Sequence, residues 1–310
     1  MTRILITGAA GLVGQALLPE LQGHEVFATD IKRPDSMPEN VHYLPMDVTT
    51  DAPARVICNV KPEVIVHLAS IVTPPPKMER AAAYAVDVEG TRKVVNAALA
   101  NGVRRLVVTS SGAAYGYHAD NPVPLREDDP LRGNPEFPYS DHKRQVEEML
   151  AEVRRAAPDL EQVVLRVGTV LGAGSENQIT ALFHKPRLLA VVGSESPFVF
   201  IWTHDLARIL QRAATDGPVG VYNVAGDGAM GVTDLARAMG KPVLRLPAWA
   251  LKSALAAARP LGLSRYGPEQ VRFLQYRPVL DNTALKSDFG YTPEKTSAQV
   301  FALWQKQAGL

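Results

Sequence analysis

Three glycines near the N-terminus constrain the fold of this chain more than any other feature. Gly8, Gly11 and Gly14 have the spacing GxxGxxG, follow the apolar run RILIT and open a helix-like segment. In such a turn the first glycine permits the tight bend, the second lets backbone approach a pyrophosphate, and the third lets the helix pack on the strand. The free N–H groups and positive dipole of the helix N-terminus then favour phosphate. The segment, including Leu12 and Val13, therefore predicts a dinucleotide-binding loop.

An acid at the end of the second strand-like run indicates which dinucleotide binds. The run EVFAT ends at Asp30, sixteen residues after Gly14. A carboxylate there can accept hydrogen bonds from both adenosine ribose hydroxyls, which favours NAD. Lys32 and Arg33 lie just beyond and offer charge for a 2′-phosphate, so NADP stays an alternative. The other interpretation of Asp30 is a turn residue that ends a strand.

Strand-like and helix-like patterns alternate over the first half of the chain, which predicts βαβ units and a parallel sheet. The expected fold is a doubly wound α/β (Rossmann) domain over residues 1–172, to which later segments return. Residues 173–310, punctuated by proline and glycine, are expected to be mostly a smaller substrate-binding region. The expected strands are 3–7, 25–29, 41–43, 64–68, 105–109 and 162–167, and the expected helices are 11–21, 81–100 and 139–157. Pro19 lies inside the first helix and is unexplained by this assignment.

Composition excludes several classes of function. The net charge is +1 over 310 residues, so no global field attracts nucleic acid or an anionic membrane. Cys58 is the only cysteine, which rules out an intrachain disulfide, fits a reducing cytoplasm and predicts a buried thiol. The histidines show no ligand spacing with carboxylates, so no metal site is expected. No window of 18 uninterrupted apolar residues exists, and residues 246–263 are expected to form an amphipathic helix rather than a membrane span.

Polar residues follow the expected strand at 105–109 and begin the expected helix at 139–157. Ser110 and Ser111 follow the strand directly, and Tyr139 and Lys143 stand at i and i+4 in YSDHK, on one helix face. A tyrosine has an ordinary pKa of about 10, which is too high for a base at neutral pH. An ammonium one helical turn away, together with the positive nicotinamide ring, favours the phenolate and lowers that pKa. The three middle residues of YSDHK are expected to matter less than the spacing that they keep.

Nine segments in order along the chain resemble the extended short-chain dehydrogenase/reductase family, in its NAD-dependent epimerase/dehydratase branch and with UDP-glucose 4-epimerase-like features. The segments are ITGAAGLVG at the start, DV at 47–48, HLAS at 67–70, DVEGT at 87–91, VVTSSGAAYG at 107–116, YSDHK at 139–143, LRVGTVLG at 165–172, HDLA at 204–207 and DNTALKSDFGYTP at 281–293. The resemblance implies a catalytic set of Ser111, Tyr139 as general acid/base, and Lys143.

The same resemblance implies further contacts with the cofactor. They involve Asp47 and Val48 after the third strand, and Leu68, Ala69 and Ser70 after the fourth. An acid at Asp47 can accept from the adenine amino group, and the alternative is a helix N-cap. His67, beside these residues, is expected to be structural.

Departures from the family pattern limit the substrate. Aspartate stands at Asp87 where the family usually has asparagine, so Asp87 either keeps that backbone-setting role or tunes the site. No acid pair follows Ser111, where the chain has Gly112, Ala113 and Ala114, which argues against a 4,6-dehydratase.

Phe198 stands where nucleotide-sugar epimerases commonly carry an arginine that binds the substrate diphosphate, and a phenyl ring cannot pair with phosphate. Arg277, Lys185 and Arg187 are candidate replacements. Alternatively, Phe198 lines an apolar pocket or belongs to the core. The candidate substrate contacts are Ser111, Ala113, Phe198 and Arg277.

These observations predict an NAD-dependent enzyme that moves a hydride at an alcohol or ketone carbon of a small, carbohydrate-like molecule. The first hypothesis is a sugar or nucleotide-sugar epimerase. The second is a simple NAD(P)-dependent dehydrogenase or reductase of a non-nucleotide substrate, and the third is a dinucleotide-binding protein without turnover. By resemblance, the helices at 81–100 and 139–157 pair across a homodimer, and neither nucleic acid nor membrane is an expected partner.

Overall fold

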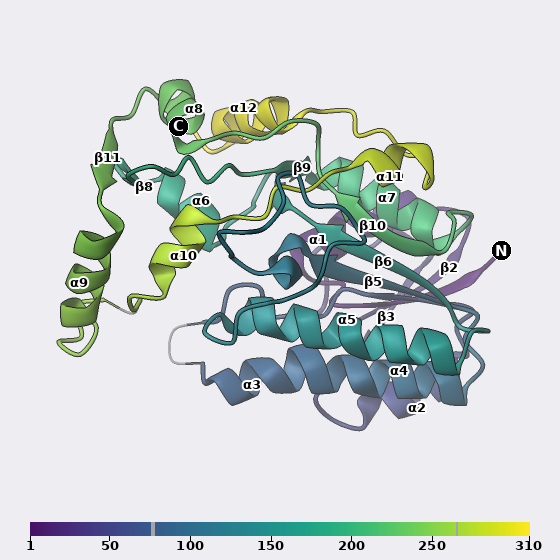
Figure 1. The fold of residues 1–310 in the computed structure, drawn as a ribbon. Helices are drawn as coiled ribbons and strands as arrows, with labels where there is room; N and C mark the ends of the chain where they lie inside the picture. Colours follow the sequence, from purple (N-terminus) through teal and green to yellow (C-terminus); the bar gives the residue numbers. More distant parts are fainter. Residues whose placement is uncertain (76–77, 265) are drawn as a thin grey trace.

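The computed structural model of the protein describes residues 1–75, 78–264 and 266–310 and centres on a sheet of seven strands (Figure 1). All neighbours in the sheet are parallel, in the order β10-β6-β5-β4-β1-β2-β3. The strands are β1 (Arg3–Thr7), β2 (Glu25–Asp30), β3 (Val41–Pro45), β4 (Val64–His67), β5 (Arg105–Ser111), β6 (Glu161–Val167) and β10 (Gly220–Val224). The order reverses between β1 and β4, which confirms the doubly wound parallel fold.

Helices cover one face of the sheet below β4, β5 and β6 in Figure 1. They are α2 (Ala52–Val60), α3 (Arg80–Tyr84), the π-helical turn η2 (Ala85–Gly90), α4 (Thr91–Ala100) and α5 (Pro138–Ala156). Aliphatic side chains at helical spacing, such as Val94, Ala98, Val146 and Leu150, pack against the strands and form one core cluster. The expected helix at 81–100 is therefore continuous but widened in the middle by η2.

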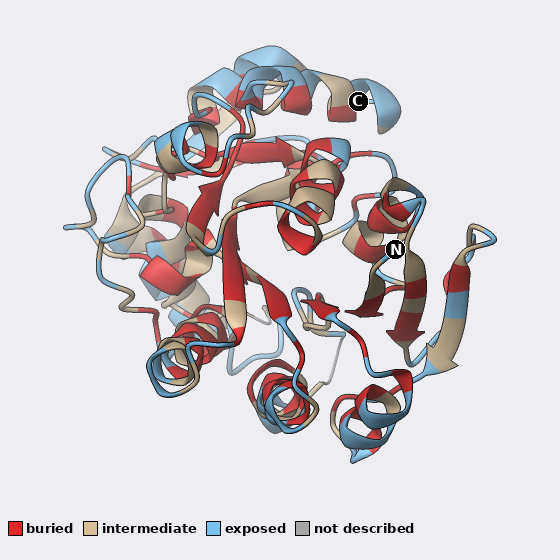
Figure 2. Cartoon of the chain, turned by 90° about the vertical axis from the view of Figure 1, so that its right-hand side faces the viewer, coloured by how far each residue is buried: buried red, intermediate tan, exposed pale blue. Residues whose placement is uncertain are grey.

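The opposite face carries α1 (Leu12–Leu17), the 3-10 helix η1 (Leu18–Leu21), α7 (Thr203–Ala214) and α11 (Thr283–Ser287). Their buried side chains, including Leu17, Leu206 and Leu285, form a second core cluster with the sheet. Figure 2 shows the buried strands between helices whose outward sides are exposed. Pro19 lies in the first turn of η1, where its missing N–H has no helical partner to lose. The end of α1 before it explains why this proline is tolerated.

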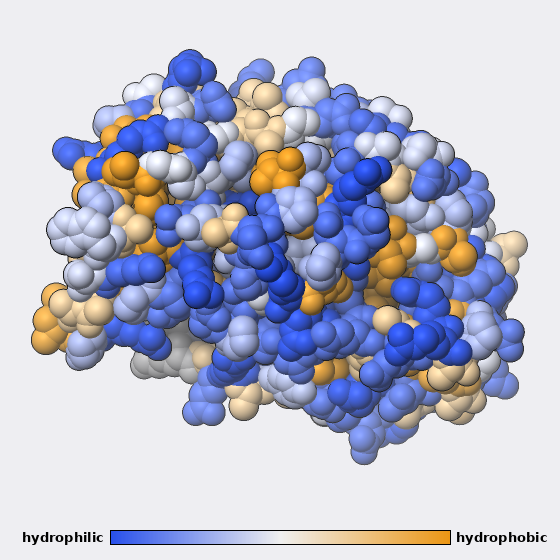
Figure 3. All heavy atoms as spheres, viewed as in Figure 1, coloured by the Kyte–Doolittle hydropathy of each residue, from blue (hydrophilic) through white to orange (hydrophobic). Residues whose placement is uncertain are grey.

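The remaining elements form a smaller region beside the carboxyl ends of the central strands. It contains the strand pairs β7 (Thr169–Leu171) with β9 (Phe200–Trp202) and β8 (Leu188–Val191) with β11 (Val243–Leu246), and the helices α6 (Gln178–Phe183), α8 (Val232–Met239), α9 (Ala248–Ala258), α10 (Gln270–Gln275) and α12 (Ser297–Gln307). Its core contains an aromatic cluster around Phe183, Phe200 and Phe301. In the view of Figure 3 its surface mixes hydrophilic atoms with separate apolar groups.

β10 is a seventh strand that the pattern of the first half did not include, because it lies beyond residue 172. The expectation of a buried thiol is wrong, since Cys58 is exposed on α2. Residues 246–263 contain the short helix α9, packed through Leu251 onto its own region. Across the described residues, every helix is too short or too polar to cross a membrane.

Candidate active site

The glycine loop between β1 and α1 has no room for side chains. Gly8 has a left-handed φ of +69°, and a Cβ there would lie 2.7 Å from the backbone nitrogen of Ala69. A Cβ on Gly14 would lie 2.6 Å from the Cα of Ala9. Both contacts are with backbone, which cannot move aside like a flexible side chain. A Cβ on Gly11, by contrast, would meet only the Gly8 carbonyl, at 3.3 Å. The loop therefore keeps its backbone bare at the edge where α1 begins, with Leu12 and Val13 in its first turn.

The Asp30 carboxylate is anchored beside this loop. Its Oδ2 accepts a hydrogen bond of 3.0 Å from the N–H of Ala10, within the glycine loop. Its Oδ1 accepts from the N–H of Lys32 at 3.3 Å. An ionised carboxylate has about four acceptor positions, so each oxygen keeps capacity for a ribose hydroxyl. The bare loop and this anchored acid both fit a dinucleotide, and the acid favours NAD over a 2′-phosphorylated cofactor.

The other predicted cofactor contacts lie at the same edge of the sheet. The N–H groups of Leu68 and Ala69 both donate to Thr7 Oγ1 at 3.2 Å, which presses this segment against Gly8. Asp47 is exposed, and its Oδ1 accepts from the backbone and hydroxyl of Thr49. This local turn precedes α2, whose N-cap residue is Asp51. The N-cap alternative for Asp47 is therefore wrong. Val48 is buried against the Cα of Gly90.

The three predicted catalytic side chains meet at the carboxyl end of β5. Ser111 is the last residue of β5, and its Oγ accepts from the N–H of Ala113 at 3.2 Å, in the 3-10 helix η3 (Gly112–Tyr115). Tyr139 and Lys143 lie in the first two turns of α5, with the Lys143 Nζ 5.6 Å from the Tyr139 ring centroid. Lys143 Nζ donates to the carbonyl of Thr109 at 2.9 Å. Their catalytic roles stay predictions, but the fold brings all three together.

Burial dominates the protonation of this group. It raises the pKa of the Tyr139 phenol well above its ordinary value, and the hydrogen bond with Ser111 opposes that rise. It also lowers the pKa of the Lys143 ammonium, which the charges of Asp87 and Glu147 oppose. The predicted lowering of the tyrosine pKa involves the nicotinamide ring as well as the ammonium, so it stays a prediction for the NAD complex. Further positive charge must enter the site before the phenolate forms near neutral pH.

The middle residues of YSDHK do more than keep the spacing of Tyr139 and Lys143, because all three are buried and hydrogen-bonded. Ser140 Oγ donates to the carbonyl of Ala113 at 2.7 Å, which ties α5 to the turn after Ser111. Asp141 accepts from Arg80, Arg144 and Gln145. The Nδ1 of His142 lies 2.8 Å from a carboxylate oxygen of Asp87.

His67 is structural, and its surroundings determine its tautomer. Thr91 Oγ1 donates to the carbonyl of Asp87 at 2.6 Å, so it accepts from His67 Nε2 at 2.8 Å. Thr7 Oγ1 receives two backbone N–H groups, so its own hydrogen goes to His67 Nδ1 at 2.7 Å. Burial lowers the pKa of His67 to about 3, which keeps the ring neutral. The ring therefore connects β1 to the start of α4.

A buried ion pair lies beneath the catalytic group. Both oxygens of Glu147 contact the guanidinium of Arg166, and Glu147 also accepts a short hydrogen bond from Ser110. Arg166 also donates a hydrogen bond of 2.7 Å to the hydroxyl of Tyr115. These contacts join α5, β5 and β6. Ser110 therefore belongs to the support of the site, and Ser111 alone of the two serines lies beside Tyr139.

Phe198 belongs to the core, stacked on Phe200 with ring centroids 5.7 Å apart. The guanidinium of Arg277 lies 3.9 Å from the centroid of its ring and 4.7 Å from that of Phe273. Arg277 thus brings a cation from a distant segment over the ring of Phe198. The other two candidates, Lys185 and Arg187, are exposed elsewhere.

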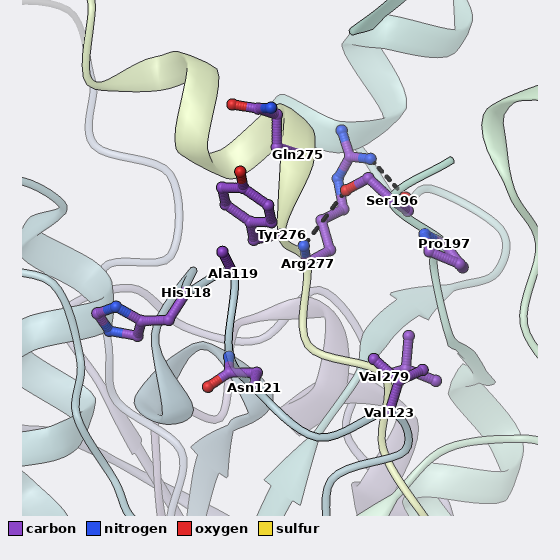
Figure 4. Close-up of a pocket in the computed structure, with 10 residues that line it drawn as sticks. All are labelled: His118, Ala119, Asn121, Val123, Ser196, Pro197, Gln275, Tyr276, Arg277 and Val279. Atoms are coloured by element: carbon purple, nitrogen blue, oxygen red, sulfur yellow. Dashed lines mark hydrogen bonds between the residues drawn. The ribbon is translucent and has the colours of Figure 1, made fainter. Parts of the chain in front are cut away.

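A small hollow of about 100 Å³ lies beside Arg277 (Figure 4). Arg277 donates to the carbonyl of Ser196 at 2.8 Å, but its buried Nε lacks a partner among the described residues. Among the same residues no carboxylate pairs with this guanidinium, and burial lowers its pKa to about 9. Tyr117 packs edge-on against Phe137, the residue before α5, and against Phe273, whose ring Arg277 also contacts.

Sequence reasoning missed several residues that support the site: Thr7, Thr91, Ser140, His142 and Glu147. The unusual aspartate in DVEGT was the one signal, because a buried carboxylate requires a donor. Local sequence could not identify His142 as that donor, since 55 residues separate the two. Among the described residues, no group of three or more histidine, cysteine or acidic side chains is arranged to hold a metal ion.

Known proteins resemble this chain in sequence. The sequence profile described as NAD dependent epimerase/dehydratase family matches residues 4–225. An uncharacterized protein of Mycobacterium tuberculosis is 26% identical over 319 residues, covering 99% of this chain and 84% of that one. The UDP-glucose 4-epimerase of Azospirillum brasilense is 28% identical over 214 residues, covering 65% and 60%.

Solved structures share the fold. The Bordetella bronchiseptica enzyme WbmG, in complex with NAD and UDP, has a TM-score of 0.75 at 22% identity, covering 99% of this chain and 95% of that one. The Thermus thermophilus UDP-glucose 4-epimerase in complex with NAD has a TM-score of 0.76 at 21% identity, covering 98% of each. The profile match spans well over half of the chain and includes the glycine loop and YSDHK. This protein therefore belongs to the NAD-dependent epimerase/dehydratase family, with NAD as its cofactor.

Proposed function

We propose that this protein is an epimerase that inverts a secondary alcohol of a sugar carried on an anionic group, with a nucleotide-sugar as the substrate class. The observation that carries the proposal is the assembly of Ser111, Tyr139 and Lys143 at one edge of the sheet, beside the glycine loop. Parallel α/β sheets bind ligands at the carboxyl ends of their strands, where these side chains lie.

The chemistry follows from the residues present. NAD, when bound, supplies a hydride acceptor and donor. Tyr139 takes the proton of the substrate hydroxyl as the alcohol becomes a ketone, and returns it when the alcohol forms again. Ser111 donates a hydrogen bond to the same substrate oxygen as its charge changes. Lys143 keeps a positive charge next to the phenol, with its Nζ oriented by the carbonyl of Thr109.

Arg277 supports an anionic substrate. A buried guanidinium without a carboxylate partner is costly unless a ligand supplies the negative charge. Its position over the ring of Phe198 restores a cation where the family arginine is absent. Arginine matches the geometry of phosphate oxygens through two parallel hydrogen bonds. The diphosphate of a nucleotide-sugar is the substrate group that fits this chemistry.

The alternative is a simple dehydrogenase or reductase of a non-nucleotide hydroxy or keto compound. Phe198 favours it, because this aromatic side chain is part of the core rather than a diphosphate ligand. Such an enzyme would use the same three residues, release its product and exchange the nicotinamide.

The assay that separates the two starts from protein purified without added NAD. Heat denaturation of this protein is expected to release bound NAD, which absorbance and mass spectrometry identify. The protein is then expected to interconvert UDP-glucose and UDP-galactose, followed by NMR, without added cofactor and without action on the free sugars. If turnover needs stoichiometric NAD and accumulates reduced cofactor, the epimerase proposal fails and the dehydrogenase is supported. Conversion of free sugars alone would contradict the anionic substrate.

The same proposal includes a homodimer, with α4 and α5 of each copy meeting in a four-helix bundle, and a cytoplasmic location. The outward side of α5 carries charged residues such as Arg144 and Glu148, which pair with each other. Such an interface would therefore be polar at its rim. Light scattering of the purified protein is expected to give about twice the chain mass of 33.6 kDa. A monomeric mass would contradict it.

A further inference from the structure

Asp87 is a buried carboxylate at the edge of the candidate site, with 3% of its surface exposed. Its Oδ1 accepts from the hydroxyl of Ser70 at 2.9 Å and from the N–H of Ile71 at 2.7 Å. Its Oδ2 faces the Nδ1 of His142 at 2.8 Å. The carboxylate therefore connects the segment after β4 to the helix that carries Tyr139 and Lys143.

The backbone around Asp87 is itself unusual. Asp87 lies in η2, a π-helical turn between α3 and α4, and such turns are frequent at functional sites. Its carbonyl accepts a hydrogen bond from the hydroxyl of Thr91. The ring of His67 is hydrogen-bonded both to that hydroxyl and to Thr7 on β1. Asp87 is thus linked to the segment after β4 and to α5 through its carboxylate, and to β1 through its backbone carbonyl.

His142 has Asp87 as its hydrogen-bond partner, and its ring is fully buried. The ring packs edge-on against Tyr84, with centroids 5.4 Å apart, and its Nε2 lacks a partner among the described residues. Because His142 directly precedes Lys143, the position of its ring constrains the turn that carries the catalytic lysine.

Charges around Asp87 favour its ionised form. Burial alone would raise the pKa of its carboxyl group, but the hydrogen bond from His142, the charge of Lys143 and the donors Ile71 and Ser70 hold it below its ordinary value. From α5 the facing titratable groups are Tyr139, His142 and Lys143, with Glu147 on the far side of Lys143. From β4 the facing group is His67, which is neutral.

We propose that Asp87 and His142 act as one positioning unit, which ties the segment after β4 to the Tyr139–Lys143 turn and places a fixed negative charge beside the reacting groups. The unit deepens the proposed function and rests on it, since it assumes that Tyr139 transfers the proton. The carboxylate raises the pKa values of both Tyr139 and Lys143. Removing its charge while keeping its shape should therefore make the phenolate easier to form.

The test is Asp87→Asn, which is isosteric and keeps an acceptor for Ser70 and Ile71. His142 can change tautomer so that its Nδ1 accepts from the new amide. The acid limb of the kcat/KM profile, which reports formation of the phenolate, is expected to move to lower pH by roughly one unit. Loss of structure alone would lower the amplitude without moving the limb. A folded variant whose limb coincides with that of the wild type overturns the proposal. The matched control is Glu89→Gln, which removes an outer carboxylate of the same π-helical turn, paired with Arg92, and should leave the limb in place.

Substitutions of His142 supply a second test, which can be carried out even if Asp87→Asn does not fold. His142→Ala removes the donor to Asp87 and is expected to lower kcat by about tenfold or more, through misplacement of the Lys143 turn. His142→Asn can present an amide N–H in place of Nδ1–H and is expected to restore most of that kcat. Equal kcat values for the alanine and asparagine variants would overturn the tie between the two residues.

A readout without turnover separates this proposal from the proposed function. Tyrosine labelled with ¹³C at Cζ reports the protonation of Tyr139 by NMR in the NAD complex, with the resonance assigned by its loss in Tyr139→Phe. Asp87→Asn is expected to lower the titration midpoint of that resonance, whatever substrate the enzyme uses. A shifted midpoint without epimerase activity supports the unit and rejects the epimerase. An unshifted midpoint rejects the unit even if epimerisation occurs.

Discussion

Replacing Tyr139 with phenylalanine is expected to lower kcat by about a thousandfold, the typical contribution of a positioned general acid or base. The variant loses one hydroxyl and keeps the ring, so its packing in the first turn of α5 is retained. NAD binding should change little, because the glycine loop and Asp30 are untouched. The loss should therefore appear in kcat with the cofactor still bound, measured by the same UDP-sugar interconversion assay and by the NAD content of the purified variant.

Tyr222→Phe is the matched control for that experiment. The Tyr222 hydroxyl donates to the carbonyl of Val219 at 3.0 Å, on the edge strand β10. Its removal should leave kcat within a factor of about two, because this buried hydroxyl bonds to the carbonyl of Val219 and not to a predicted catalytic residue or the glycine loop. Full activity of Tyr139→Phe would reject Tyr139 as the general acid/base of both enzymatic hypotheses. NAD binding without any turnover by the wild type would favour the dinucleotide-binding protein.

Gly8→Ala is expected to have the largest effect on cofactor binding. An added Cβ would lie 2.7 Å from the nitrogen of Ala69 and 2.8 Å from the carbonyl carbon of Leu68, and both atoms belong to backbone. Overpacking of this kind and a left-handed alanine together cost roughly 3 kcal/mol. The loop must shift to relieve the contact, so its N–H groups leave their positions. Loss of NAD binding in calorimetry and a lower free energy of unfolding in urea would both follow.

Gly23→Ala separates the clash from the backbone strain. Gly23 also has a positive φ, of +82°, but a Cβ there would meet nothing within 4 Å. The control should therefore cost only about 1–2 kcal/mol from the left-handed conformation and leave NAD affinity unchanged. Equal losses of stability and of NAD affinity in the two variants would show that crowding against Ala69 is not what makes glycine necessary at residue 8.

Burial favours the neutral form of the Tyr139 phenol in the protein alone. The phenol and the ammonium are both buried, and burial disfavours the charged form of each. Lys143 donates its hydrogen bond to Thr109, so its nitrogen is held beside the ring without a bond to the phenol oxygen. We therefore expect Tyr139 to form its phenolate only when the cofactor site is filled. When that site is empty, the tyrosine should transfer no proton.

Local patterns in the sequence were reliable where one stretch of chain contains the whole physical cause. A strand, three glycines and a helix lie within residues 3–17, and close contact with backbone is the reason for Gly8 and Gly14. The spacing of Tyr139 and Lys143 similarly needs only helical geometry. Pro19 shows the limit of such patterns, because apolar spacing continues through it while the helix changes to a 3-10 turn. The predicted burial of Cys58 was wrong because residue type alone does not indicate which face of α2 packs against the sheet.

The sequence by itself determined the doubly wound fold, the cofactor loop and the identity of the three candidate catalytic side chains. Only the tertiary structure decided that Asp87 meets His142, that Arg277 covers Phe198 and that Glu147 lies beneath Ser110. These pairs are 55, 79 and 37 residues apart, where helical or strand periodicity carries no information. They exist because a buried charge or donor must find a partner, and the partner is chosen by which elements the fold packs together.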